Sequence, residues 1–249
     1  MKEMKTKFKM ITLSTVTALT LSFAGQSYAA ITPFSDITNV EAKDKIIALQ
    51  EQGLVHGISD DLFAPNATVT AAQGVQLIVK ALNLNLDLVR FLVEPKATDY
   101  FKNADNDAWY ANALITASVN GVVLPADLDP NKKWTREEFT HQLISTIETH
   151  SNLPQIKLVP AQINDNADLT IDYEGSIQRA LAYNVVKLDD QGNFHPKAEI
   201  SRAEAAVQIY NALEYMKAHP APSPQPDPAS ETSSKRSPSS TIPQIPGTK

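Results

Sequence analysis

The sequence predicts an all-α fold built from three tandem helix-loop-helix repeats. A Ser or Thr is followed three residues later by Glu or Gln at positions 70, 135 and 201, and these spacings of 65 and 66 residues indicate an internal repeat. An apolar stripe with helical spacing follows each box. No sustained alternation of apolar and polar residues predicts a large sheet, so the class is all-α.

The second helix of each repeat is predicted to begin at one of these boxes. In a capping box the Ser or Thr oxygen accepts a hydrogen bond from the third helical amide, and the Glu or Gln side chain accepts one from the cap amide. The capping pairs are Thr70 and Gln73, Thr135 and Glu138, and Ser201 and Glu204. The apolar stripes continue at Ile78 and Leu82, Leu143 and Ile147, and Ile209 and Leu213.

The first helix of each repeat is predicted to end at a residue that tolerates left-handed backbone. These helices are expected near residues 41–52, 109–119 and 172–183, followed by Gly53, Gly121 and Asn184. A proline lies five residues before each cap and favours an extended approach to the second helix. These prolines are Pro65, Pro130 and Pro196.

The two ends of the chain are predicted to lie outside the repeats, which are expected at residues 30–96, 97–158 and 159–218. Residues 1–29 have the basic start, short apolar stretch and small-residue cleavage site of a secretory signal peptide. The alternative is an uncleaved membrane anchor, which needs about 20 apolar residues. No other segment is predicted to cross a membrane. The Pro- and Ser-rich residues 219–249 are predicted to be a disordered tail, either a spacer or a frayed terminus.

Charge and composition exclude several functions. The chain carries a net charge of −6, and the predicted signal peptide carries +3, so the mature chain is expected to carry a net charge of −9. Because an acidic protein gains nothing from releasing the counterions of nucleic acid, nucleic acid is not an expected partner. The absence of cysteine excludes thiol catalysis and thiolate metal sites. No nucleophile elbow or phosphate loop is present, so we expect no enzyme and no cofactor.

One stretch imitates a calcium loop but is not expected to bind a metal. Asp127, Asp129, Asn131 and Glu138 have the spacing of calcium ligands. Lys132 occupies the position at which the loop needs Gly, and Glu138 already serves a cap.

Two arginines occupy the second position of a box, where the helix dipole disfavours a cation. Arg136 and Arg202 lie in the first helical turn. An anion docked among the free amides of the helix start, with the guanidinium forked onto it, would resolve this mismatch. The alternative is that Glu137, or a carboxylate from a neighbouring repeat, pairs with the arginine. Because Ala71 replaces the arginine in the first repeat, that helix should form but its anion site should be missing or weak.

The chain resembles S-layer homology (SLH) repeats. The resemblance rests on the Thr-Arg-x-Glu boxes, on Phe34-Ser35-Asp36-Ile37 and on the stretches 53–57 and 61–65, and it covers roughly residues 32–217. It implies a pseudo-threefold, three-pronged spindle that binds pyruvylated secondary cell wall polymer non-covalently, in grooves between the prongs. The box arginine would contact the carboxylate of a pyruvylated sugar, a role that falls to Arg136 and Arg202.

The resemblance implies a secreted, non-catalytic protein of a bacterial cell surface with a wall polysaccharide as its partner. Trp109 has two interpretations, a ring face for a sugar or a core residue at the start of an amphipathic helix. The alternative function is an S-layer-associated platform that recruits protein partners through the tail without binding glycan. A third interpretation is an accessory module of an enzyme, although no catalytic domain is recognised in this chain.

Overall fold

Six α-helices make up most of the regular structure in residues 32–154 and 156–221, the part of the chain that the computed structural model describes. They are α1 (Lys43–Glu51), α2 (Ala71–Ala81), α3 (Ala111–Val119), α4 (Arg136–His150), α5 (Glu174–Ala182) and α6 (Arg202–Ala218). Four short 3-10 turns are η1 (Ser35–Ile37), η2 (Ala97–Asp99), η3 (Asn166–Asp168) and η4 (Ile171–Tyr173). These residues contain isolated bridges but no strand, and the predicted all-α class is confirmed.

Two predictions fall on residues that the structure does not describe. The signal peptide at 1–29 lies wholly outside the described residues, and the tail at 219–249 lies outside them from residue 222 onward. The expected repeat boundaries fall between α2 and η2 and between α4 and η3, and they remain predictions.

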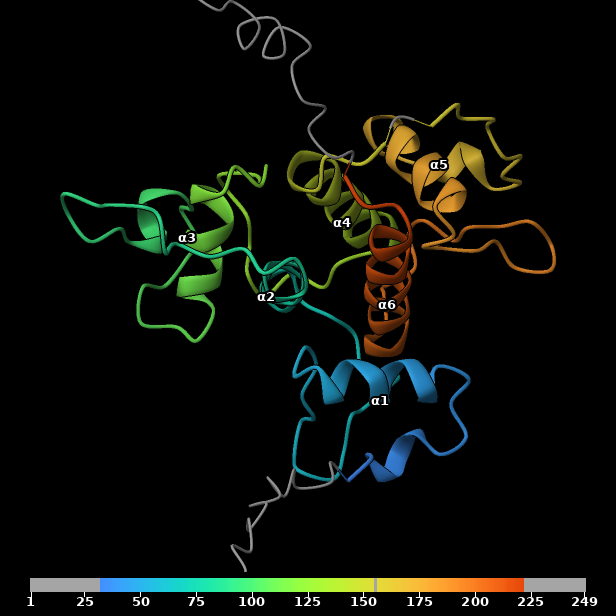
Figure 1. Ribbon diagram of the computed structural model, residues 1–249, viewed down its shortest axis with the longest axis horizontal. Coiled ribbons are helices and arrows are strands. Elements are labelled where there is room, and N and C mark those ends of the chain that lie inside the picture. The colour runs from blue at the N-terminus through green and yellow to red at the C-terminus, as the bar shows by residue number, and fades with distance from the viewer. Residues whose placement is uncertain (1–31, 155, 222–249) are drawn as a thin grey trace, which may run out of the picture. The chain divides into compact units, whose positions relative to one another are not determined.

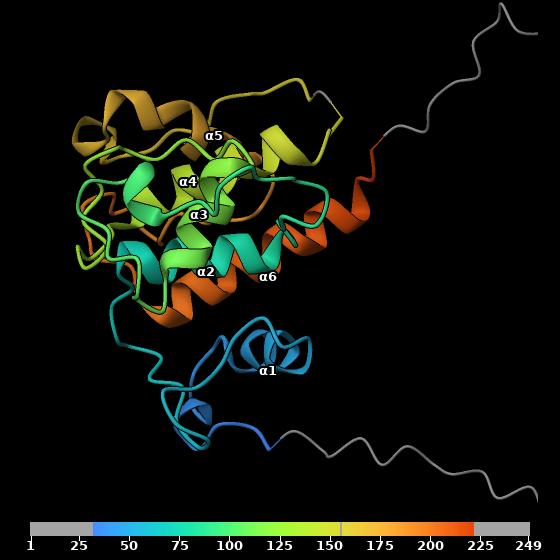
Figure 2. The same ribbon diagram turned by 90° about the vertical axis from the view of Figure 1, so that its left-hand side faces the viewer.

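The three helices that begin at the capping boxes, α2, α4 and α6, pack against one another, and α1, α3 and α5 lie outside them (Figure 1). Each inner helix packs on the outer helix that follows it in the chain, α2 on α3 and α4 on α5. The last helix, α6, packs on the first, α1, as Figure 2 shows from a second direction. The helix pairs therefore combine successive repeats, and the pairing closes into a cycle.

The inner helices begin and the outer helices end at the residues that predicted these limits, whereas the outer helices begin at residues 43, 111 and 174, two residues after the expected positions. Reciprocal capping-box hydrogen bonds are formed at the starts of α2, α4 and α6, through Thr70, Thr135 and Ser201. The outer helices are followed by residues with positive φ, which allows the chain to turn away from the helix axis. These residues are Gly53 (68°), Gly121 (77°) and Asn184 (56°).

A closed ring of three backbone hydrogen bonds joins the residues that precede the caps. The Val69 amide donates to the Ile200 carbonyl (3.1 Å), the Ile200 amide to the Trp134 carbonyl (3.0 Å), and the Trp134 amide to the Val69 carbonyl (2.9 Å). All three side chains are buried. Each residue donates to one neighbouring repeat and accepts from the other, so the ring holds the starts of α2, α4 and α6 in a fixed register.

The loop before each cap also satisfies the first free amides of a neighbouring inner helix. At α4, the amides of Arg136 and Glu137 donate to the carbonyls of Ala198 (2.8 Å) and Pro196 (3.1 Å). The corresponding bonds join Arg202 and Ala203 of α6 to Ala67 and Pro65, and Ala71 and Ala72 of α2 to Lys132 and Pro130. Because helix-start amides have no partner within their own helix, these carbonyls remove an energetic cost that each repeat alone would bear.

Close packing of the Trp134 side chain, beside the ring of backbone hydrogen bonds, depends on a glycine of α2. The Trp134 ring lies over Gly74, where an added Cβ would come within 2.4 Å of two ring carbons. Trp134 is buried and also packs edge-on against Phe139, at 6.3 Å between ring centroids. The ring therefore has little room to shift.

We expect Gly74→Ala to lower the free energy of unfolding by about 1–3 kcal/mol, because the added methyl group overpacks an enclosed site. Urea unfolding followed by circular dichroism measures this. Gly175→Ala on α5 is the matched control, since its Cβ would meet only the flexible end of the Arg179 side chain at 3.2 Å. Glycine is otherwise unfavourable in a helix, so a Gly74→Ala protein as stable as the wild type would contradict the proposed packing constraint.

Candidate functional site

Three grooves border the starts of the inner helices, and their linings differ in charge. The Arg202 groove has a volume of about 490 Å³, the Arg136 groove about 440 Å³, and the Lys132 groove about 280 Å³. Each groove takes its name from one cationic side chain in its lining. The three cations differ in whether the protein itself neutralises them.

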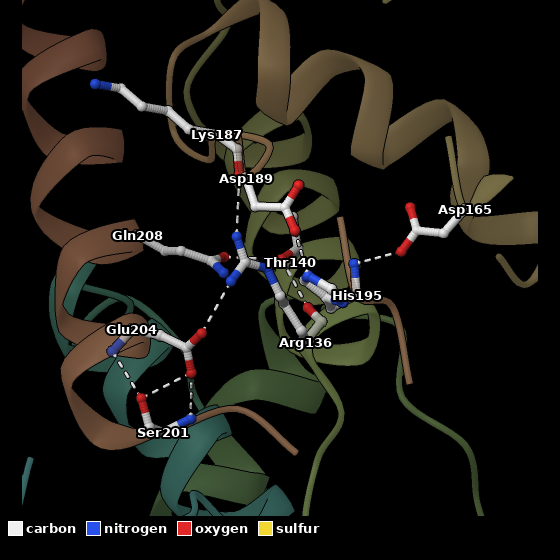
Figure 3. A network of polar contacts seen from close by, with 9 residues as sticks. All are labelled: Arg136, Thr140, Asp165, Lys187, Asp189, His195, Ser201, Glu204 and Gln208. Carbon is white, nitrogen blue, oxygen red and sulfur yellow. Dashed lines mark hydrogen bonds and ion pairs between the residues drawn. The ribbon is translucent and has the colours of Figure 1, made fainter. Parts of the chain in front are cut away.

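Arg136 is neutralised within the protein. Its Nη1 lies 2.9 Å from Glu204 Oε1, and its Nη2 donates to the Lys187 carbonyl at 3.1 Å (Figure 3). The guanidinium also lies over the Phe194 ring, 5.1 Å from its centroid. The side chain is 19% exposed. The alternative prediction for Arg136, in which a carboxylate from a neighbouring repeat pairs with it, is therefore confirmed.

Glu137, the other predicted partner, is occupied elsewhere. It is buried and accepts hydrogen bonds from the Thr170 amide (3.0 Å) and hydroxyl (2.8 Å) and from Lys197. This group ties the start of α4 to the segment before α5. Glu137 therefore serves packing between repeats and does not neutralise Arg136.

Arg202 has a different set of partners, all of them carbonyl oxygens or an aromatic ring. Its Nε donates to the Phe63 carbonyl and its Nη2 to the His56 carbonyl, both at 2.8 Å, and the guanidinium lies 4.6 Å from the centroid of the Phe63 ring. Burial lowers the pKa of Arg202, and the negative charge of Asp36 opposes this shift. Within residues 32–154 and 156–221, no ion pair involves Arg202.

The loop that receives Arg202 is fixed by the half-buried carboxylate of Asp36. Asp36 accepts hydrogen bonds from the amides of Phe63 (2.9 Å) and Ala64 (2.7 Å), and Ala64 has a left-handed φ of 58°. The same arrangement recurs at Asp165, which accepts from Phe194 and His195. Each Phe ring that lies under an arginine is thus positioned by an Asp at the start of the repeat to which the Phe belongs.

The Arg202 groove also gathers Lys80, His56 and Trp109, and none of the described residues that line it is acidic. Lys80 Nζ lies 3.4 Å from His56 Nδ1. Trp109 is 58% exposed and contacts Tyr110 edge-on, so its interpretation as a core residue is wrong. Lys80 and His56 were not predicted as site residues. Lys80 lies seven residues beyond Gln73 on α2, and this spacing places Lys80 and Gln73 on the same helix face.

The prediction that an anion docks among free helix-start amides is wrong. At all three inner helices, loop carbonyls occupy the first two amides after the cap, and the capping box occupies the cap and third amides. The physical reason is that the three helix starts meet at the ring of backbone hydrogen bonds, where loop carbonyls of neighbouring repeats accept hydrogen bonds from their amides. Any anion binding must therefore come from side chains.

Lys132 supplies a cation next to Ala71, the position that lacks the arginine. Ala71 is fully buried, and its amide donates to the Lys132 carbonyl. The Lys132 ammonium pairs with Glu138, and this hydrogen bond raises the pKa of Lys132. Asp127 and Asp129 also line this groove. The Lys132 groove is therefore acidic on balance, and the missing or weak anion site of the first repeat stays a prediction.

The described part of the chain holds neither a metal cluster nor a membrane span. In residues 32–154 and 156–221, no group of three or more His, Asp or Glu side chains is placed to hold a metal ion. In the same ranges no helix is long and apolar enough to cross a membrane.

A polar loop supports the Arg136 groove (Figure 3). Asp189 accepts hydrogen bonds from the amides of Asn193 (2.8 Å) and Gln191 (2.9 Å) and contacts His195 Nε2 at 2.7 Å. The Asn193 amide is the largest cause of the low pKa of Asp189, about 2, and the contacts with His195 and Gln191 lower it further. The loop also contains Lys187, whose carbonyl accepts from Arg136.

We expect Asp189→Asn to reduce the acid sensitivity of the fold. A carboxyl with a depressed pKa stabilises the folded state above its unfolded pKa, near 3.8, and this contribution is lost as the pH falls toward 2. The unfolding free energy of the wild type should therefore fall more steeply between pH 4 and pH 2 than that of the variant. Asp190→Asn is the control at the adjacent position. Parallel pH profiles for wild type and Asp189→Asn would show that this loop does not couple to folding.

Comparison with known proteins identifies the class. Residues 33–73 and 169–206 match the family described as the S-layer homology domain, and these segments include the boxes at 70–73 and 201–204. The chain thus contains SLH domain sequence in two of the three predicted repeats, and the middle repeat remains a prediction. SLH domains are cell-wall-binding modules, and their presence indicates a protein of the cell surface.

Similar proteins are longer than this chain. The chain is 29% identical over 183 residues to the exoglucanase XynX of Acetivibrio thermocellus, covering 73% of this chain and 16% of that protein. It is 28% identical to the amylopullulanase of Thermoanaerobacterium thermosulfurigenes, covering 73% and 9%. It is 25% identical to the surface-layer 125 kDa protein of Lysinibacillus sphaericus, covering 78% and 16%. The region shared with these relatives is therefore a small part of each.

Proposed function

We propose that this protein attaches non-covalently to an anionic secondary cell wall polymer and that the Arg202 groove is its main binding site. The observation that supports this most directly is the composition of that groove. Arg202, Lys80 and His56 gather there beside the exposed Trp109, and the lining contributed by residues 32–154 and 156–221 contains no carboxylate. A ligand carboxylate would supply the missing negative charge.

The chemistry of the groove fits a sugar that bears a carboxylate. A guanidinium forms charge-assisted hydrogen bonds with a carboxylate, and the Lys80 ammonium adds a second positive charge within the groove. Trp109 offers a ring face on which the apolar side of a sugar can pack. A pyruvylated amino sugar combines both features, so we propose a pyruvylated polymer as the ligand.

The Arg136 groove is proposed as a secondary site. An anion there must compete with Glu204 for the guanidinium, and Lys45 and Lys187 provide the remaining positive charge. Because the chain as a whole is acidic, neither groove gains from a long-range attractive field. Binding should depend on individual cations and only modestly on salt at long range.

The proposed role is attachment without catalysis. The described residues that line the Arg202 groove include no carboxylate pair and no nucleophile beside a base, the arrangements that hydrolases of sugars and acyl groups need. The enzyme names of two relatives describe proteins much longer than the shared region.

We expect Arg202→Met to weaken binding to purified wall sacculi by about tenfold to a hundredfold, the range for loss of hydrogen bonds to a charged group. Arg136→Met should have a smaller effect, since Glu204 already engages that side chain. Trp109→Ala should weaken binding by about tenfold. Co-sedimentation with sacculi gives the dissociation constants, and circular dichroism verifies that each variant is folded.

Sacculi stripped of pyruvyl groups provide the matched ligand control. The wild type should lose affinity on this wall, and the difference between wild type and Arg202→Met should shrink. Undiminished binding by folded Arg202→Met protein on native wall would remove this groove from the mechanism. Equal binding of the wild type to both walls would rule out the pyruvyl carboxylate.

A second function, a platform for protein partners, is supported by one exposed segment. Leu88, Leu92 and Val93, after α2, are 98%, 105% and 81% exposed, which is unusual for clustered apolar side chains. If this function holds, Leu88→Ser with Leu92→Ser, or deletion of residues 219–249, should abolish co-purification of surface proteins while wall binding persists. If both variants retain every partner and only Arg202→Met detaches the protein, the platform function is excluded.

A further inference from the structure

The third residue of each inner helix faces a groove as well as its own cap. Glu204 uses Oε2 to accept from the Ser201 amide (2.9 Å), and its Oε1 binds Arg136 (2.9 Å). Glu138 likewise uses Oε2 for the Thr135 amide (2.8 Å), and its Oε1 contacts Lys132. One carboxylate oxygen therefore serves the helix and the other neutralises a cation of the neighbouring groove.

Gln73 occupies the equivalent position in the Arg202 groove. Its Oε1 accepts from the Thr70 amide at 3.0 Å, so the cap is intact. The second atom of its side-chain head is an amide nitrogen, which is a hydrogen-bond donor and carries no charge. Because the cap requires the oxygen to face Thr70, the amide cannot turn an acceptor toward Arg202 without breaking that bond.

The cyclic arrangement makes this single difference decisive for the charge of one groove. The first residue of α4, Arg136, meets the third residue of α6, Glu204, across a separation of 68 residues. The first residue of α6, Arg202, lies in the groove that the third residue of α2, Gln73, also lines. A Glu at position 73 would be placed to pair with Arg202 as Glu204 pairs with Arg136.

We propose that Gln73 is a specificity-determining residue: it caps α2 and, having no charge, leaves Arg202 available to a ligand anion. This inference rests on the proposed function, since it concerns the same groove. In the Arg136 groove, Glu204 occupies the corresponding position and engages Arg136, so a ligand anion binds there less favourably. The preference of the protein for one of its two arginine grooves thus depends on a Gln-to-Glu difference within the capping boxes.

Gln73→Glu tests the proposal, because it keeps the cap and adds a carboxylate. We expect unchanged thermal stability and about tenfold weaker binding to sacculi. Gln73→Ala is the matched control: it removes the side-chain half of the capping box and lowers stability, but it adds no charge, so its binding loss should be smaller than that of Gln73→Glu although its stability loss is larger. A purely structural role of Gln73 would make the binding loss follow the stability loss.

Two further variants separate this proposal from the proposed function. Arg202→Met in the Gln73→Glu background should cause little further loss, since the arginine is already engaged. Glu204→Gln, which keeps its cap, should restore part of the affinity of Arg202→Met by releasing Arg136. If Arg202→Met weakens binding but Gln73→Glu does not, the role of Gln73 is refuted and the Arg202 groove stands. If Arg202→Met itself has no effect, the proposed function fails as well.

Discussion

The structure depends on the closed ring of backbone hydrogen bonds among Val69, Trp134 and Ile200. A buried backbone amide or carbonyl without a partner is costly, and in this ring each repeat satisfies the groups of the next. The three inner helices consequently start side by side, and their first amides are satisfied by carbonyls of the adjoining loops. This arrangement leaves the side chains at the first and third helical positions as the groups that determine the chemistry of the grooves.

Because neighbouring repeats interlock in a cycle, no groove belongs to one repeat. In the Arg202 groove the arginine comes from α6, the ring beneath it from the loop before α2, Lys80 from α2, and Trp109 from the segment before α3. A substitution in one box therefore changes the groove of another repeat. Ala71 and Gln73 lie in the same box, yet Ala71 takes the place of an arginine beside one groove and Gln73 takes the place of an acid in another.

The resemblance of this region to parts of much longer proteins agrees with its use as an attachment module. The matched relatives include enzymes and a surface-layer protein, and the shared region makes up 9–16% of those described above. A module that satisfies its helix starts through internal contacts can retain its fold while the exposed residues of its grooves vary. In this chain the three grooves differ in charge although the three helix starts are satisfied in the same way.

Local structure could be predicted from the sequence because its causes are local. The capping boxes at positions 70, 135 and 201 and the left-handed residues Gly53, Gly121 and Asn184 act within a few residues of themselves, and the helices begin and end there. The importance of Arg136 and Arg202 was also evident, since a cation at a helix start needs a compensating group. The sequence by itself thus determined the six helices of the described part of the chain, the starts of the inner helices, the ends of the outer helices and the interest of the two arginines.

Tertiary structure alone decided what each arginine meets. The partner of Arg136 lies 68 residues away and that of Arg202 139 residues away, at distances that no periodic pattern encodes. The same is true of the exposed position of Trp109, the replacement of the missing arginine by Lys132, and the occupation of the helix-start amides. The physical reason is that these properties arise only when the three repeats close into a cycle, which brings the start of each inner helix against the loop of another repeat.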